Sequence, residues 1–284
     1  MGMIEPVLSG SPLAEQIAGG APGEERLALW WMGQSGFLLR RGDLVVGFDL
    51  YLSNYLAATR PGPGRAYDRQ TRAPLRPDEL TCLDLLVVSG SQPDHLDPDS
   101  VGALLAASPR ALLLLPASLA DFAADELDVP DERLVPIADR EFFDLDGLRL
   151  QAIAASADAD AGPLAYVLQI DPLSVLLVGQ SEPYDGFAER LATFAPALAL
   201  LPISGRGARL QQLGAEGSLT AVEAARLADE SGAQVVVPHH FDMFALHHAD
   251  VGAFCEHTRH HYPRLKTKVL EPGGRWLFPG ERRD

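Results

Sequence analysis

Short apolar runs separated by turn-forming residues occupy most of the chain. Residues 26–53 are expected to form three strands, with turns near Gly33–Gly36 and Arg41–Asp43. The other apolar runs are short and bounded by Gly, Pro, Asp or polar residues, which is typical of buried strands. The further predicted strands cover residues 84–89, 111–116, 133–137, 140–145, 148–155, 165–170, 174–179, 198–205 and 233–239.

Three segments have helical spacing of their apolar residues: 99–107, 117–127 and 218–233. In the last one, Thr220 and Glu223 have the spacing of a capping box and Gly232 is placed to end the helix. Strands come first, then mixed strands and helices, then the same again. This order favours an α/β fold of two packed sheets flanked by helices over a simple alternating doubly wound sheet.

The predicted domain organisation is simple. Residues 1–25 form an N-terminal extension and residues 26–284 form a single domain. Residues 54–80 are rich in Pro, Arg and Gly, and we expect them to form a long excursion or lid.

Composition narrows the classes of partner. The 284 residues carry a formal net charge of −16, which disfavours binding to nucleic acid and to anionic membrane surfaces. Two cysteines, Cys82 and Cys255, do not indicate a disulfide framework. No signal-peptide pattern and no apolar run of about 20 residues is visible, so we expect a cytoplasmic protein.

The loop after the strand at 84–89 carries candidate chemistry. It reads "SGSQPDHLDP" and places Gln92, Asp94 and His95 directly after a buried strand. Loops at strand ends commonly carry functional side chains. Asp94 and His95 alone are a weak signal for a metal site.

Five stretches in order strengthen that signal through a resemblance. "WWMGQSGFLL" (30–39), "VGFDLYLS" (46–53, with Asp49), "LLPISGR" (200–206), "EAARLADESGAQVVVPHHFDMF" (223–244) and "EPGGRW" resemble motifs of the metallo-β-lactamase-fold superfamily. The resemblance covers residues 26–277, and the branch that the chain resembles most is the ascorbate-6-phosphate lactonase (UlaG-like) family. The resemblance implies the metallo-β-lactamase αββα sandwich, and it implies relatives that assemble into oligomers.

The resemblance also implies a metal motif, H-x-H-x-D-H, of which this chain keeps half. Gly90 and Gln92 stand at the two histidine positions, whereas Asp94 and His95 are retained. The other family ligands map as follows: Ser156 or a neighbour stands at the third histidine, Gln180 at the bridging aspartate and His240 at the last histidine.

A binuclear centre is therefore not expected, because Gly offers no ligand and Gln only a neutral oxygen. Asp94, His95 and His240 can form a two-histidine, one-carboxylate site for one divalent metal, Mn or Zn. Asp49 would orient His95, and Gln180 or Gln92 could add an oxygen. A metal-free pocket stays open, in which Asp94 and His95 act as acid and base.

Several residues are candidates for binding substrate, each beside an ordinary structural role. Arg206 resembles the arginine of the family's N-G-R turn and could hold a phosphorylated substrate, or form a salt bridge. Tyr184 could line the pocket mouth or pack. His239 follows the opposite face from His240 on an extended chain, and Gln92 and Gln180 complete the set of predicted substrate contacts.

Two further groups of residues are expected away from the site. One of Trp30 and Trp31 should lie in the core and the other should face the site or a partner. A group of histidines near the C-terminus is expected on a solvated face rather than at a metal: His247, His248, His257, His260 and His261.

The leading functional prediction is a UlaG-like hydrolase of a small, anionic substrate, a lactone or a phosphorylated compound, with at most one metal. Two alternatives stay open. One is a metal-independent isomerase or lyase, and the other is a non-catalytic binding or scaffold protein on the same fold. A homo-oligomer is expected from the resemblance alone.

Overall fold

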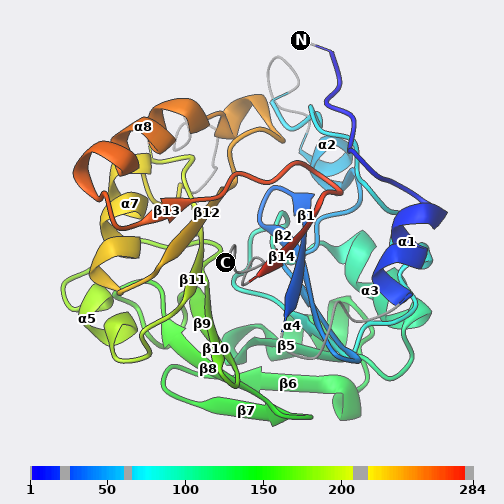
Figure 1. Ribbon diagram of the computed structural model, residues 1–284. Coiled ribbons are helices and arrows are strands. Elements are labelled where there is room, and N and C mark those ends of the chain that lie inside the picture. Colours follow the sequence, from blue (N-terminus) through cyan, green and yellow to red (C-terminus); the bar gives the residue numbers. More distant parts are fainter. Residues whose placement is uncertain (1, 20–25, 61–65, 207–216, 279–284) are drawn as a thin grey trace.

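Two seven-stranded mixed sheets pack face to face, with helices on the outer sides (Figure 1). The computed structural model describes residues 2–19, 26–60, 66–206 and 217–278. The predicted αββα sandwich is thus confirmed, and it follows from apolar strands that need cover on both faces.

The first sheet has the strand order β14-β1-β2-β3-β4-β5-β6. Its strands are β1 (Leu27–Gly33), β2 (Gly36–Arg41), β3 (Leu44–Phe48), β4 (Leu85–Val87), β5 (Leu112–Pro116), β6 (Leu134–Ile137) and β14 (Arg275–Phe278). Pairing is antiparallel from β14 to β3 and parallel from β3 to β6.

The second sheet has the order β13-β12-β11-β10-β9-β8-β7. Its strands are β7 (Phe142–Leu145), β8 (Leu148–Ala154), β9 (Leu164–Ile170), β10 (Leu173–Leu177), β11 (Leu198–Pro202), β12 (Val235–His239) and β13 (Lys266–Thr267). Pairing is antiparallel from β7 to β10 and parallel from β10 to β13. The parallel part of each sheet brings several strand ends to one edge.

Helices cover both outer faces (Figure 1). They are α1 (Ser11–Ala18), α2 (Tyr55–Thr59), α3 (Pro98–Ala107), α4 (Ala120–Glu126), α5 (Phe187–Ala192), α7 (Ala221–Glu230) and α8 (Val251–His261). Short 3₁₀ turns are η1 (Pro77–Glu79), η2 (Ala117–Leu119), η3 (Asp131–Arg133) and η4 (Ala245–His247). Within the described residues, no helix is both long and apolar enough to cross a membrane.

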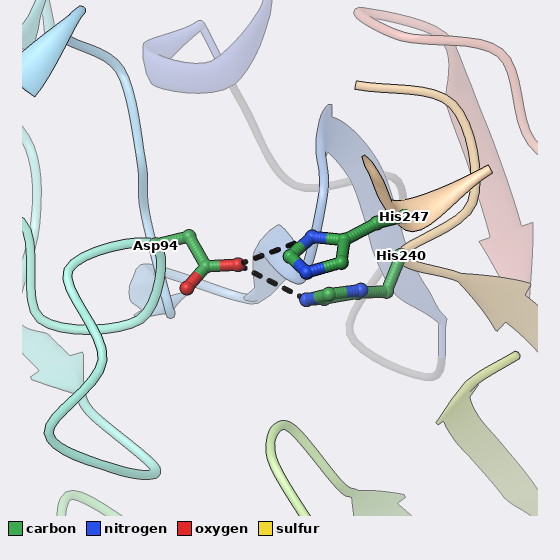
Figure 2. A group of neighbouring side chains, drawn as sticks. All are labelled: Asp94, His240 and His247. Carbon is green, nitrogen blue, oxygen red and sulfur yellow. Dashed lines mark hydrogen bonds and ion pairs between the residues drawn. The ribbon is translucent and has the colours of Figure 1, made fainter. Parts of the chain in front are cut away.

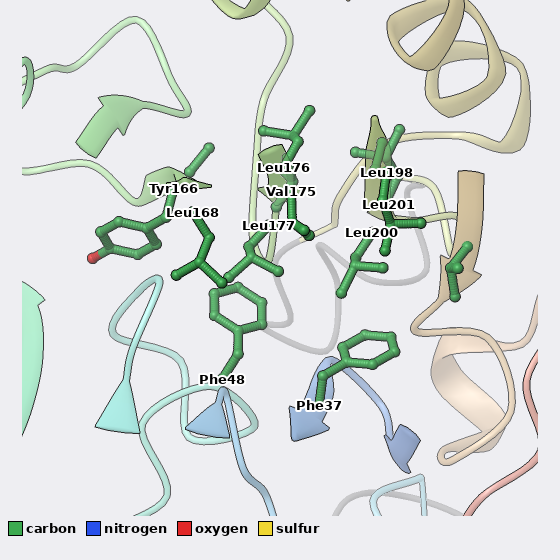
Figure 3. Close-up of a cluster of buried hydrophobic side chains, with 14 of the residues drawn as sticks. Phe37, Phe48, Tyr166, Leu168, Val175, Leu176, Leu177, Leu198, Leu200 and Leu201 are labelled. Carbon is green, nitrogen blue, oxygen red and sulfur yellow. The ribbon is translucent and has the colours of Figure 1, made fainter. Parts of the chain in front are cut away.

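Alternation along the strands divides the core into two layers. Phe37 and Phe48 point from the first sheet toward Leu168, Leu177 and Leu200 of the second (Figure 3). The opposite faces of β1 and β2 pack against α1 and α3. The strand pattern alone therefore fixes which side chains meet across the sandwich.

Both tryptophans of β1 are buried, which corrects the expectation that one of them faces the site or a partner. Trp30 packs toward α1, and its Nε1 donates to Gln16 Oε1 at 2.9 Å. Trp31 lies between the sheets, with its ring centroid 5.1 Å from that of Phe241. Part of the predicted N-terminal extension thus forms α1, which packs onto this domain.

The remaining predicted elements match closely. The capping box forms at Thr220, whose hydroxyl accepts from the backbone N–H of Glu223. Gly232 follows that helix with φ +81°. The patterns did not predict α1, α5 or β13, which are short or lie beside polar stretches.

The described parts of the predicted lid, residues 54–60 and 66–80, pack against the segment after β12. Leu56 and Tyr67 join Tyr51, Phe244 and Leu246 in a small apolar cluster. A single β-bridge connects residues 69 and 244. The excursion therefore forms one wall beside the strand ends, where the candidate site lies.

Candidate metal centre and pocket

Loops at one edge of the sandwich supply the candidate site. They are the β1–β2 turn, the ends of β3 and β4, and the segment after β12. A pocket opens there. It is lined by Leu56, Arg60, Tyr67, Gln92, Asp94, His95, Gln180, Gly217, Ser218, His240 and His247.

Three buried side chains converge at this pocket: Asp94, His240 and His247 (Figure 2). Asp94 Oδ2 lies 3.1 Å from His240 Nε2 and 4.0 Å from His247 Nδ1. Their ligand atoms all lie within 4.8 Å of one another. One carboxylate oxygen and two imidazole nitrogens at this spacing are a donor set that suits a single divalent metal.

His247 was missed by the sequence reasoning, and its expected solvated position is wrong. Its side chain is buried at the centre of the site because Phe244, four residues after His240, anchors the loop against Tyr51. His248 is exposed, as expected. The other three histidines predicted to lie on a solvated face are on α8, where His260 and His261 are exposed and His257 is partly exposed.

Gln34, in the turn between β1 and β2, was also missed. Its side-chain Nε2 lies 2.8 Å from Asp94 Oδ2, 2.8 Å from His240 Nε2 and 3.0 Å from His247 Nδ1. Its backbone carbonyl accepts hydrogen bonds from Trp31 Nε1 and from the backbone N–H of His240. The turn is thereby fixed to the segment that carries the histidines.

His95 lines the same pocket, but its ligand atom does not belong to the close group of three. Its Nδ1 lies 2.6 Å from Asp49 Oδ2, and that oxygen also accepts from Ser89 Oγ at 2.6 Å. A carboxylate can only accept, so the proton of the His95–Asp49 bond resides on Nδ1. The structure thus pairs Asp49 with His95, in the arrangement expected for an orienting carboxylate.

A hydroxyl holds the far side of His240. Its Nδ1 lies 2.9 Å from Ser204 Oγ, which in turn lies 3.0 Å from Ser218 Oγ. A partner on one ring nitrogen fixes the ring and directs the other nitrogen, Nε2, toward Asp94.

The charges of the cluster are those that metal ligands require. Burial alone would raise the pKa of Asp94, but His95 and the hydrogen bond with His240 outweigh it and hold the pKa well below its usual range. Burial lowers the pKa of His247 to about 3, with repulsion from His240 adding to the effect. At neutral pH the carboxylate is therefore charged and His247 is neutral.

Backbone conformation at the site is unusual. Gln34, Asp49 and His240 have φ values of +49°, +44° and +61°, a region that residues other than glycine rarely adopt. Such conformations persist where the surrounding structure holds them, and they cluster at functional sites. Three such residues around one pocket indicate that the placement of their side chains, rather than the conformational preference of the backbone, determines these conformations.

Some of the side chains that were predicted to bind substrate line the pocket, and others do not. Gln92 and Gln180 line it. Arg206 instead pairs with Glu223 and donates to a backbone carbonyl, and Tyr184 donates to the carbonyl of residue 154. His239 is fully buried between the sheets with its Nε2 3.0 Å from the carbonyl of residue 178. The structure does not bring these last three side chains to the pocket.

The positions without family ligands are filled in a consistent way. A Cβ added at Gly90 would lie 3.1 Å from Gln180 Oε1, so this glutamine side chain occupies space beside the missing histidine. Ser156 Oγ donates to the carbonyl of residue 158. Neutral side chains thus stand at the positions where the sequence resemblance placed further ligands.

Comparisons with known proteins agree with this picture. A UPF0173 metal-dependent hydrolase of Aeropyrum pernix is 23% identical over 273 residues, which cover 88% of this chain and 97% of the relative. Solved structures of a possible metal-dependent hydrolase from Veillonella parvula (TM-score 0.69, 16% identity, covering 89% of this chain and 99% of that one) and a metallo hydrolase from Ignicoccus hospitalis (TM-score 0.66, 18%, 90% and 100%) share the fold. The family model described as a beta-lactamase superfamily domain matches residues 59–241, more than half of the chain, and the protein therefore belongs to this family.

Proposed function

We propose that the protein is a hydrolase that uses one divalent metal, held by Asp94, His240 and His247. The observation that carries the proposal is the buried group of one carboxylate and two imidazoles within 4.8 Å at a pocket. The relatives named metal-dependent hydrolases support the same reaction class. His247 takes the place that the sequence reasoning gave to His95.

The side chains of the pocket divide the chemical work. A bound divalent metal supplies polarisation of a substrate oxygen and a lowered pKa for water. Asp94, His240 and His247 bind it. His95, with its Nδ1 proton held by Asp49, presents its Nε2 as the atom that can take up or return a proton at the pocket.

The pocket lining favours a small anionic substrate. Arg60 and the polar side chains of Gln92, Gln180 and Ser218 surround the cluster. In a chain with a net charge of −16, a guanidinium at the pocket offers a local attraction for a carboxylate or phosphate. A lactone or a phosphorylated compound, as in the UlaG-like branch, fits this lining.

Metal content and hydrolysis test the proposal together. We expect near-stoichiometric manganese or zinc in the purified protein, measured by mass spectrometry, and turnover of lactones or phosphoesters. His247→Ala should lose metal and turnover, whereas His260→Ala, at an exposed histidine, should keep both. Full metal content in His247→Ala would contradict the ligand set, and absence of metal from the unmodified protein would refute the metal mechanism.

One observation keeps a metal-independent reaction as a second candidate. His95 lines the pocket without belonging to the metal group and is paired with the buried Asp49, so it could transfer protons in an isomerase or lyase. A chelator separates the two candidates, because it abolishes turnover only in the hydrolase. A cytoplasmic location and a homo-oligomer stay predictions from the sequence.

A further inference from the structure

The Gln34 amide contacts all three residues of the cluster, and it has fewer protons to donate than there are acceptor atoms around it. An amide NH₂ has two protons. Three acceptor-type atoms lie within 3.0 Å of Nε2, on Asp94, His240 and His247. If His240 Nε2 carries a proton for Asp94, 3.1 Å away, it cannot also accept from Gln34.

The other end of the same amide is equally unsatisfied. Gln34 is fully buried, and its Oε1 has no hydrogen-bond partner. Buried polar groups without partners are rare and costly, and each needs an explanation. Three candidate ligand atoms share one NH₂ group, and the oxygen of the same amide has no partner. A bound cation would satisfy both the ligand atoms and this oxygen.

The distances point the same way. Two ligand atoms that each lie about 2.1 Å from one ion, in tetrahedral or octahedral arrangement, are separated by about 3.0 to 3.4 Å. Gln34 Nε2 lies 2.8, 2.8 and 3.0 Å from the atoms of Asp94, His240 and His247, and the Asp94–His240 distance is 3.1 Å. The Asp94–His247 distance is longer, at 4.0 Å. The end of the Gln34 side chain is thus in contact with all three candidate ligand atoms.

We propose that Gln34 is the fourth protein ligand of the metal, through its amide oxygen Oε1. This inference rests on the metal site proposed above. A half turn of the amide exchanges Oε1 and Nε2 with little change in shape. Coordination requires the orientation in which Oε1, rather than Nε2, faces Asp94, His240 and His247.

The position of Gln34 suits this role. Its φ of +49° turns the side chain into the site, and its backbone carbonyl is pinned by Trp31 Nε1 and the N–H of His240. A ligand on a fixed turn is placed before the metal arrives.

The ligand set also bears on the choice of metal. Carbonyl and carboxylate oxygens suit harder ions such as manganese, while a site rich in imidazole and thiolate suits zinc. Two histidines with a carboxylate and an amide oxygen therefore favour manganese more than the three-residue set does. Removal of the amide oxygen should shift the site toward zinc.

Metal affinity measured by competition with a fluorescent chelator tests the proposal without any substrate. Gln34→Met keeps the length of the side chain and removes the oxygen, and we expect Mn²⁺ to bind about tenfold or more weakly. Gln34→Glu supplies a charged oxygen at the same place and should bind Mn²⁺ more tightly. Gln180→Met is the matched control, a buried glutamine of the same pocket, and should leave the affinity unchanged.

Absorption of the Co²⁺-loaded protein gives a second readout, since the visible spectrum reports the ligand set. It should change in Gln34→Met and stay unchanged in Gln180→Met. Equal Mn²⁺ affinity and spectrum in Gln34→Met and the unmodified protein would overturn this inference and leave the three-ligand site standing. A loss in Gln180→Met alone would assign the oxygen to Gln180 instead.

Two further outcomes complete the test. No binding of Mn²⁺, Zn²⁺ or Co²⁺ by the unmodified protein would overturn both the inference and the proposed function. If thermal melting shows that Gln34→Met does not fold, Gln34→Glu decides, and failure to tighten Mn²⁺ binding would overturn the inference.

Discussion

Asp49→Asn probes the pair that orients His95. The Asp49 carboxylate accepts from the backbone N–H of Ser89 at 2.8 Å, from Ser89 Oγ at 2.6 Å and from His95 Nδ1 at 2.6 Å, all in the protein interior. Asparagine retains one acceptor oxygen and places an NH₂ group where the second oxygen was. If the oxygen stays on the Ser89 N–H, the NH₂ faces His95 Nδ1.

The expected cost follows from these contacts. Hydrogen bonds to a charged group contribute about 1.5 to 3 kcal/mol each, and a neutral amide retains roughly half of that. We expect Asp49→Asn to lower the free energy of unfolding by about 2 to 4 kcal/mol. The NH₂ group also forces His95 to shift its proton from Nδ1 to Nε2, which removes Nε2 as a base. Loss of a general base typically lowers turnover on the order of 10²- to 10⁴-fold.

Urea unfolding followed by tryptophan fluorescence measures the stability, and nitrogen-15 NMR of the imidazoles reports which nitrogen of His95 carries the proton. Asp97→Asn is the matched control. Asp97 is also fully buried, but it accepts from Ser53 Oγ and Ser100 Oγ rather than from His95. Asp97→Asn should keep both the tautomer of His95 and turnover. A tautomer of His95 that is unchanged in Asp49→Asn would refute the reasoning.

Burial raises the pKa of Asp242 to about 6, so its ionisation opposes folding above that pH. Asp242→Asn should raise the free energy of unfolding by about 2 kcal/mol at about pH 8 and leave it nearly unchanged at about pH 4, and an equal effect at both would contradict this. Gly102→Ala, in α3 with open space around the added Cβ, should stabilise by about 0.5 to 1 kcal/mol in urea unfolding. Gly179→Ala would place a Cβ 2.0 Å from Ser89 Oγ and 2.3 Å from Asp49 Oδ2, so we expect the free energy of unfolding to fall by about 2 kcal/mol or more. An unchanged free energy of unfolding would show that these side chains can move aside.

The elements that sequence patterns predicted well are those fixed by local physics. The apolar runs formed strands, most of them covered on both faces, and Thr220 with Glu223 formed the capping box that its spacing predicts. The resemblance supplied the order of the strands' motifs and thereby the sandwich. Asp94, His95 and His240 met at one pocket because strand ends of the two sheets share an edge.

His247 and Gln34 could not be read from local pattern. His247 stands in a short 3₁₀ turn next to the exposed His248, and its burial comes from Phe244 packing on Tyr51, a contact between distant segments. Gln34 lay within the quoted motif "WWMGQSGFLL", but a glutamine in a turn carries no chemical signal by itself. The contacts of its Nε2 with Asp94, His240 and His247, and the hydrogen bond from the His240 N–H to its carbonyl, show that this turn belongs to the site.

His240 offers a test of whether function outweighs backbone strain at the site. Its φ of +61° costs a residue with a Cβ about 1 kcal/mol, whereas glycine adopts it freely. Both His240→Gly and His240→Ala remove the imidazole, so their difference isolates the backbone. We expect the glycine variant to be more stable than the alanine variant by about 1 kcal/mol in urea unfolding.

At His247, which is not among the described residues with positive φ, the order should reverse. Glycine there only adds flexibility to the unfolded chain, so His247→Gly should be less stable than His247→Ala by about 0.5 to 1 kcal/mol. If glycine is the more stable replacement at His240 and alanine at His247, the backbone at His240 is strained. The strain is then retained for the direction that it gives the imidazole. The same order at both positions would mean that no strain is stored at His240 and that its conformation is incidental to the site.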